Sequence, residues 1–190
     1  GANSNGAVTV TGENSVWESS VLTYIGFEGV GSLVIEDGGS VATTGIAGIG
    51  ASPDSTGTVR VSGGGSAWTT AMLGIGGQGN GTLTVANGGR ISVTGATFGL
   101  AFDVASSGTL NIGAASGETA QAAGAVDAAS LTFGPGTGTL VFNHTGNPDG
   151  SDLVFSSSLS GSGTILQENG TTSLTGDNSG FTGTTTVSGG

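Results

Sequence analysis

One short pattern of apolar and polar positions returns along the whole chain. It consists of a glycine, a small residue, an apolar residue, any residue and a second apolar residue. Seven copies occur: GAVTV at 6, GSLVI at 31, GTVRV at 57, GTLTV at 81, GTLNI at 108, GTLVF at 138 and GTILQ at 163. Their first glycines are 25, 26, 24, 27, 30 and 25 residues apart, a spacing typical of solenoid coils. The pattern predicts an all-β parallel β-solenoid of seven rungs, each of roughly 25 residues.

The alternation within each copy predicts a half-buried β-strand, because successive side chains of a strand point to opposite faces. The apolar pairs that we expect to face the interior are Val8 and Val10, Leu33 and Ile35, Val59 and Val61, Leu83 and Val85, Leu110 and Ile112, and Leu140 and Phe142. The residues between them, which we expect on a mostly solvated outer face, are Thr9, Val34, Arg60, Thr84, Asn111 and Val141. Stacked coils would align the apolar pairs into one core ladder.

Glycine-rich turn signals follow these strands, and each leads into a second short strand. The clearest signals are EDGG at 36–39, GGG at 63–65 and ANGG at 86–89. Glycine suits such corners because it adopts positive φ without a steric penalty. A third short strand is predicted at YIG 24–26, GIG 48–50, LGIG 73–76 and FGL 98–100. We therefore predict three strands in each coil.

A longer repeat of two rungs is superimposed on the first. Trp17 and Trp68 lie 51 residues apart, as do the first and third copies of the strand pattern. The corner after the strand also alternates, with GENSVW and GGGSAW in odd rungs and EDGGSV and ANGGRI in even rungs. A third aromatic residue would fall at Thr119, where the pattern is lost, so a short helix or a bulging loop is expected within 114–130.

These observations predict a single β-helix over 1–190 with three parts. Paired rungs with the 51-residue unit occupy 1–107, a degenerate rung occupies 108–137, and a final repeat region occupies 138–190.

The charge and the absence of cysteine narrow the classes of partner. The chain has 13 acidic residues against two cations, Arg60 and Arg90, and no lysine. It cannot neutralise a run of phosphates, so nucleic acid is excluded and anionic membrane surfaces are disfavoured. Without cysteine there is no disulfide or thiolate metal site, and the chain can be threaded through a narrow export pore. No segment approaches the roughly 20 apolar residues of a membrane span, so we expect no membrane insertion.

The C-terminal part of the chain resembles a known family. The segment at 159–190 begins with GSGT at 161–164, continues with GTTSLTGDN at 170–178, and ends in an aromatic residue followed by TGTTTVSGG. It is similar to the passenger-associated transport repeat of autotransporters, the type V secretion proteins of Gram-negative bacteria. Phe181 takes the family's aromatic position, although Gly180 stands where the family usually has a polar residue.

The resemblance implies a right-handed parallel β-helix that crosses the periplasm and is secreted or displayed on the bacterial cell surface. Passengers of this family are exported by a C-terminal translocator barrel at the outer membrane, and we find no barrel strands in this sequence. The expected function is that of a surface-projecting virulence and adhesion factor. Its partner would be a host cell-surface protein or glycan, or a neighbouring copy through self-association. The alternative is a secreted ligand that activates a host cell-surface receptor, and the sequence does not separate the two.

Candidate catalytic groups are sparse. The single histidine, His144, lies in FNHTGNPDGSD with Asp149, Ser151 and Asp152 nearby, which are the residue types of a catalytic triad. The dipeptides NP and DG in the same segment favour a turn instead. The carboxylate pairs Glu36 with Asp37 and Asp149 with Asp152 are also explained as solvated corners.

Two further motifs add no chemistry. GIGGQG at 74–79 matches a dinucleotide fingerprint, but no helix is expected after it. No calcium loop with dense oxygen ligands occurs. We therefore expect no enzymatic activity, no catalytic or cofactor-binding residue, no metal ligand and no cofactor.

The two tryptophans are the candidate partner contacts. Trp17 and Trp68 should lie on one side of the solenoid two rungs apart, where they would form a binding stripe. Alternatively, each packs against the core at a corner. Arg60 and Arg90 are expected to be solvated or to pair with a carboxylate on the next rung.

Overall fold

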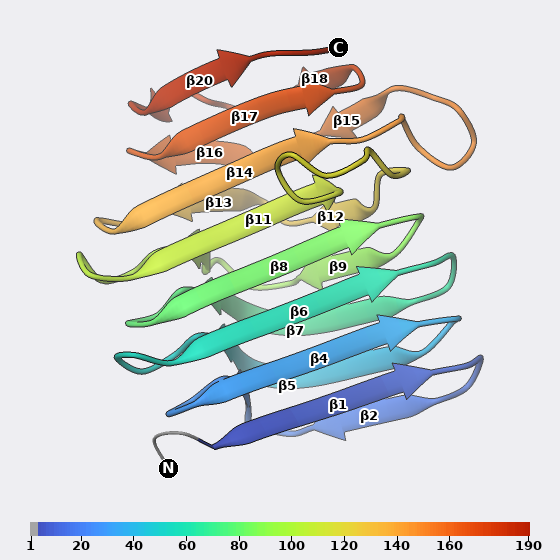
Figure 1. Ribbon diagram of the computed structural model, residues 1–190, viewed down its shortest axis with the longest axis vertical. Helices are drawn as coiled ribbons and strands as arrows, with labels where there is room; N and C mark the ends of the chain where they lie inside the picture. The colour runs from blue at the N-terminus through green and yellow to red at the C-terminus, as the bar shows by residue number, and fades with distance from the viewer. Residues whose placement is uncertain (1–3) are drawn as a thin grey trace.

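The computed structural model describes residues 4–190. A sheet of eight strands forms one long face of the molecule, here called the first face. Its strands, in spatial order, are β1 (Asn5–Thr11), β4 (Val30–Glu36), β6 (Thr56–Ser62), β8 (Asn80–Ala86), β11 (Ser107–Gly113), β14 (Thr137–Asn143), β17 (Thr164–Asn169) and β20 (Thr184–Val187). Spatial order equals chain order, and every pair is parallel (Figure 1). This is the stacking that a solenoid requires.

The register aligns each copy of the sequence pattern with the next. Gly6 pairs with Gly31, and the row continues through the first residue of every copy to Gly138. The seven predicted rungs are therefore confirmed. The final strand, β20, pairs with β17 and lies beyond the predicted set, so eight strands bound seven turns. The sequence of this segment, GTTTV at 183–187, follows the pattern except for Thr185, which lies where an apolar residue is expected.

Two further faces close the coil, as the prediction of three strands requires. The second face contains β2 (Val16–Ser19), the first half of β5 (Ser40–Ile49), the first half of β7 (Ala67–Ile75), β9 (Arg90–Val93) and β12 (Ala125–Asp127). The third face contains β3 (Leu22–Ile25), the second halves of β5 and β7, β10 (Phe98–Leu100), β13 (Ser130–Phe133), β16 (Ser158–Gly161) and β19 (Gly180–Phe181). A small sheet of β15 (Leu153–Phe155) and β18 (Thr172–Leu174) lies nearer the C-terminus.

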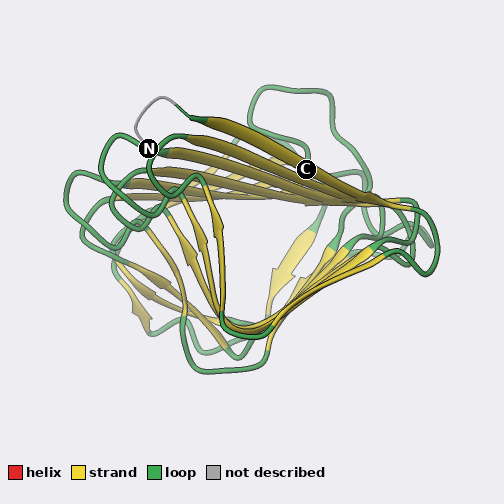
Figure 2. Ribbon diagram, turned by 90° about the horizontal axis from the view of Figure 1, so that it is seen from below, coloured by secondary structure: helices red, strands yellow, loops and turns green. Residues whose placement is uncertain are grey.

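The cross-section has three sides, seen along the axis in Figure 2. The long strands of the first face form one side, and the shorter strands form the other two. In Figure 1 the chain runs along the front of the molecule, returns behind it and rises by one strand with each turn, which is a right-handed path. The fold is thus the predicted right-handed parallel β-helix.

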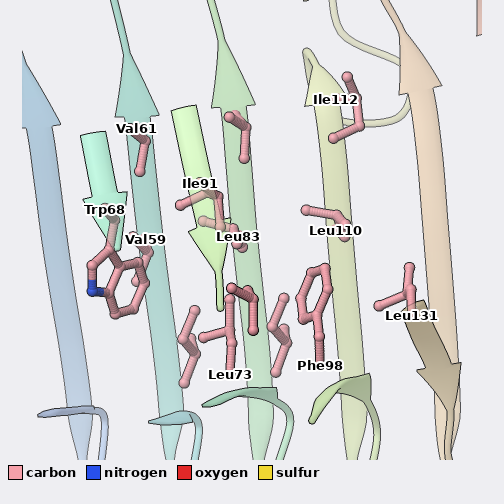
Figure 3. Packing of buried hydrophobic residues seen from close by; sticks show 14 of the residues in the cluster. Val59, Val61, Trp68, Leu73, Leu83, Ile91, Phe98, Leu110, Ile112 and Leu131 are labelled. Atoms are coloured by element: carbon pink, nitrogen blue, oxygen red, sulfur yellow. The ribbon is translucent and has the colours of Figure 1, made fainter. Parts of the chain in front are cut away.

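The interior is a stack of apolar side chains, most of them aliphatic. The pairs expected to point inward are buried from Val10 to Phe142, and most have no exposed surface. Val8 is the exception at 41% exposure, because β1 is the edge strand of its sheet within residues 4–190. Side chains of all three faces meet in this core; Figure 3 shows Trp68 beside Val59 and Phe98 near Leu110. Burial of each such side chain contributes about 1.5–3 kcal/mol.

The corner after the first face has two backbone forms that alternate. In the odd rungs positive φ occurs at alternate residues, Gly12 and Asn14, then Gly63 and Gly65. In the even rungs it occurs at consecutive residues, Asp37 and Gly38, then Asn87 and Gly88. Besides glycine, asparagine and aspartate tolerate this conformation best. The difference between the two rung types that the sequence predicts at this corner therefore lies in the backbone itself.

The degenerate stretch within 114–130 contains a bulging loop, and residues 4–190 form no helix. In Figure 1 this loop passes in front of the end of β11. Asn111 and Val141, expected among the outer solvated positions, are only 2% and 1% exposed, so for these two residues the expectation is wrong. The loop, which the local alternation does not encode, covers this part of the first face.

Candidate binding surface

The triad suggested around His144 does not assemble. The His144 ring is fully buried, with Nε2 2.8 Å from Oγ1 of Thr172, and Nδ1 accepts a hydrogen bond of 3.0 Å from the amide of Gly146. Ser151 instead donates its hydroxyl to Asp149 at 2.7 Å. Burial lowers the pKa of His144, against a smaller raising effect of the Asp152 charge. These contacts are those of a side chain that fastens a corner, as the turn dipeptides indicated.

The candidate carboxylate pairs lie on solvated corners. Asp37 accepts a hydrogen bond from the hydroxyl of Thr11 at 3.2 Å, and Asp149 binds the amide and hydroxyl of Ser151, which lowers its pKa. Within residues 4–190, no three side chains of His, Cys, Asp or Glu gather closely enough to hold a metal ion. The same part of the chain has no helix of the length and apolarity that crossing a membrane would need.

The two tryptophans differ in environment. Trp68 has no exposed surface and packs in the core, so it cannot contact a partner in the folded chain, and the core alternative describes it. Trp17 is half-buried and lines an open cavity of about 360 Å³ at the N-terminal end of the solenoid, together with Val8. A binding stripe made of both indoles is therefore excluded by the burial of Trp68.

Both arginines connect neighbouring elements. Arg90 forms an ion pair with Asp127 across the paired strands β9 and β12, as expected for a carboxylate on the next rung. Arg60 has no carboxylate partner among the described residues. It donates to Ser62 at 3.1 Å and to Gln121 at 3.0 Å, and so holds the bulging loop against the first face.

An apolar concave surface lies on the outside of the third face, and sequence reasoning missed it. We call it the apolar groove, and it encloses about 490 Å³. Its walls are the large side chains of Tyr24, Phe27, Ile46, Met72 and Phe102, each between 40% and 52% exposed. Side chains of this kind are often buried, so their concentration over four adjacent coils makes this the candidate interaction surface.

Glycines form the floor of the groove. The register places Tyr24, Gly48, Gly74 and Gly99 in one outward-facing row. A Cβ atom at Gly48 would lie 2.7 Å from the Tyr24 ring, and at Gly74 or Gly99 it would lie 3.2 or 2.8 Å from the Phe102 ring. Two rings from different coils therefore lie close to a strip of backbone where a larger residue than glycine would collide with them.

The sequence carried a partial signal for this surface. In GIG and LGIG a glycine comes directly before a buried isoleucine of the third strand, Ile49 or Ile75, so Gly48 and Gly74 had to face outward. Phe102, however, lies after its strand, and nothing local to it indicates that its ring returns over the glycines of two coils.

The comparisons with known proteins give one sequence relative. No protein-family model matches the chain, and no solved structure gives a significant match. The chain is 34% identical over 129 residues to a protein of Escherichia coli (strain K12) named "Uncharacterized lipoprotein YdeK". The match covers 67% of this chain, and the chain spans about a tenth (10%) of the length of that relative.

Proposed function

We propose that this β-solenoid is the exported passenger of a Gram-negative autotransporter and acts as a surface-projecting adhesion and virulence factor. The observation that carries the proposal is the combination of a straight, fully stacked solenoid with an apolar groove on its outer side. Seven strand spacings of about 4.8 Å give a rod of roughly 34 Å. Such a rod presents long lateral surfaces to a partner.

Three features support export and surface display. The chain lacks cysteine, so no disulfide would block its passage through a pore unfolded. The segment at 159–190 resembles the passenger-associated transport repeat and supplies the last coils of the solenoid. The name of the relative, a lipoprotein, supports association with the cell envelope.

A polar and acidic surface with one modest apolar groove favours contacts that are individually weak and gain strength from many copies. We expect beads that carry many copies of the chain to bind host cells or one another. The soluble monomer should bind with a Kd weaker than about 1 µM.

Surface plasmon resonance of the soluble monomer on purified host receptors tests the proposal. Nanomolar affinity for one receptor, with receptor phosphorylation on cells, would replace the adhesive function by that of a secreted receptor ligand. Beads that bind neither cells nor one another would overturn both functions.

A further inference from the structure

We infer that the apolar groove binds an extended peptide segment in which aromatic or aliphatic side chains are flanked by lysine or arginine. The inference rests on the proposed adhesive function and names the chemistry of the partner. It is carried by three features: the concave shape of the groove, the charge around it and the small number of polar groups in its lining.

The first feature is that the groove accepts side chains and not a flat surface. Ile46 and Met72 are neighbours in the register and form one wall, two residues before the glycine row. Phe27 and Phe102 also line the groove and lie after the third strand. Between the walls, an apolar side chain of a partner can lie against the Tyr24 and Phe102 rings and the half-buried Gly74, where it loses part of its contact with water.

The second feature is the charge around the groove. Glu28 and Asp54 occupy equivalent places, each two residues before a strand of the first face, and both are exposed at the corner beside the groove. The groove lining itself contains no charged residue. The chain carries a net charge of −11, and its two cations, Arg60 and Arg90, are bonded elsewhere. The field near the groove therefore attracts a cationic partner.

The third feature separates a peptide from a glycan. The polar side chains in the lining are few, chiefly Ser52, Gln78, Thr97 and the Tyr24 hydroxyl, whereas a sugar needs a dense set of hydrogen-bond partners to replace water. The floor is also the face of a sheet whose strands are paired within the stack, so a peptide cannot bind by adding a strand. Recognition must come from side chains that enter the groove.

The test uses the whole chain and two synthetic peptides, Ac-Lys-Phe-Lys-Leu-Lys-Phe-Lys-NH2 and the same peptide with glutamate in place of lysine. Isothermal titration calorimetry in about 50 mM salt should give saturable binding of the lysine peptide and at least tenfold weaker binding of the glutamate peptide. In about 500 mM salt the difference should fall below about threefold, because screening removes the charge contribution and leaves the apolar one.

Variants locate the binding site. Met72→Lys and Phe102→Ala should each weaken binding of the lysine peptide by at least about tenfold, and Asp54→Asn by about twofold to fivefold in low salt only. Val154→Ala is the matched control, since Val154 is exposed on another part of the chain, and its affinity should not change. Circular dichroism establishes that each variant is folded, and two wall variants are included so that one unfolded protein does not end the test.

Three results would overturn the inference: no binding of the lysine peptide, equal binding of both peptides, or unchanged affinity in folded wall variants. A neutral oligosaccharide that binds saturably in place of the peptide would also overturn it, in favour of a glycan. The bead assay separates this inference from the proposed function. If the beads adhere but the chain does not bind the lysine peptide, only the inference about the groove is wrong. If the chain binds the peptide but the beads do not adhere, only the proposed function is wrong.

Discussion

The second to fourth coils and the C-terminal coils fill the same interior by different means. In the former, inward positions such as Leu33, Val59 and Leu83 repeat aliphatic residues in one register and have no exposed surface. The C-terminal interior contains pairs of aromatic rings instead. Phe142 packs edge-on against Phe155 with ring centroids 5.5 Å apart, and Phe133 packs against Phe181 with centroids 5.3 Å apart.

The C-terminal interior also buries amide side chains, whereas the buried polar side chains of the second to fourth coils are serine and threonine hydroxyls. Asn143 is fully buried and donates to the carbonyls of Ala115 and Glu118 at 2.8 and 2.9 Å, while Asn169 donates to its side-chain oxygen at 2.8 Å. The coil starts here are 30, 25 and 20 residues apart, from Gly108 to Gly183. Coils of nearly equal length stack mainly on aliphatic residues with single aromatic ones such as Trp68, whereas unequal coils need side chains that bridge variable gaps or satisfy loop carbonyls.

The largest difference in stability between the two regions is expected when a charged residue replaces an inward-facing aliphatic residue of the regular coils. Leu83→Asp should unfold the array, because it removes a fully buried leucine and leaves a carboxylate without a partner. Leu174→Asp is the counterpart in the C-terminal region, where the side chain is 39% exposed, and should cost about 1 kcal/mol or less. Thermal melting followed by circular dichroism measures both. A Leu83→Asp protein that melts within two degrees of the parent contradicts the ladder.

Removal of an aromatic side chain should show whether the regions unfold separately. Phe142→Ala deletes a buried ring and its contact with Phe155, at a cost of about 3–5 kcal/mol. Since each coil contacts mainly its neighbours, hydrogen exchange should lose protection in β14 and β17 before β4 and β6. Val154→Ala, at an exposed site, should change neither region. Simultaneous loss of protection in all strands would show one cooperative unit.

Alanine substitutions at two corner glycines, Gly65 and Gly76, distinguish the cost of backbone strain from the cost of steric overlap. Gly65 and Gly76 have φ of 83° and 75°, but a Cβ atom has room at Gly65 and would overlap the carbonyl oxygen of Ser107 at Gly76. Gly65→Ala should therefore cost about 1–2 kcal/mol of unfolding free energy, the strain alone. Gly76→Ala should cost at least about 1 kcal/mol more. If urea unfolding gives equal losses of unfolding free energy for the two variants, the neighbouring coil at Gly76 moves enough to accommodate the methyl group.

The parts of this fold that repeat could be predicted, because one period determines strand, register and burial together. The eighth strand of the first face, β20, was not predicted because Thr185 breaks the apolar alternation of its copy of the pattern. The burial of Asn111 escaped because the loop that covers it comes from later in the chain. The first failure is local to one strand, whereas the second depends on contacts between segments whose separation differs from the repeat.

The candidate surface was predicted less well than the fold. The periodicity placed Trp17 and Trp68 on equivalent positions but could not tell whether an indole at a corner turns inward, as Trp68 does. The apolar groove depends on rings from the first and fourth coils that lie over glycines of the coils beside them. A row of glycines in sequence predicts a close approach, although it does not name the side chain that approaches.

The smallest expected effect concerns His144, which joins the C-terminal corner to Thr172 and has no equivalent in the regular coils. Its pKa is lowered from 6.5 by burial, so the folded chain holds the ring neutral where the unfolded chain binds a proton. The stabilisation is complete above pH 6.5 and is lost as the pH falls through that value toward the folded pKa, by at most about 1.4 kcal/mol per pH unit. Urea unfolding between pH 7.5 and 4.5 should show this slope, and His144→Gln should remove it.

Asp149 and Asp177 have pKa values lowered from 3.8 by hydrogen bonds, so they change the stability of the fold only at more acidic pH. As the single histidine, His144 also gives one imidazole signal in NMR, and a titration midpoint at or above 6.5 would contradict the buried neutral ring.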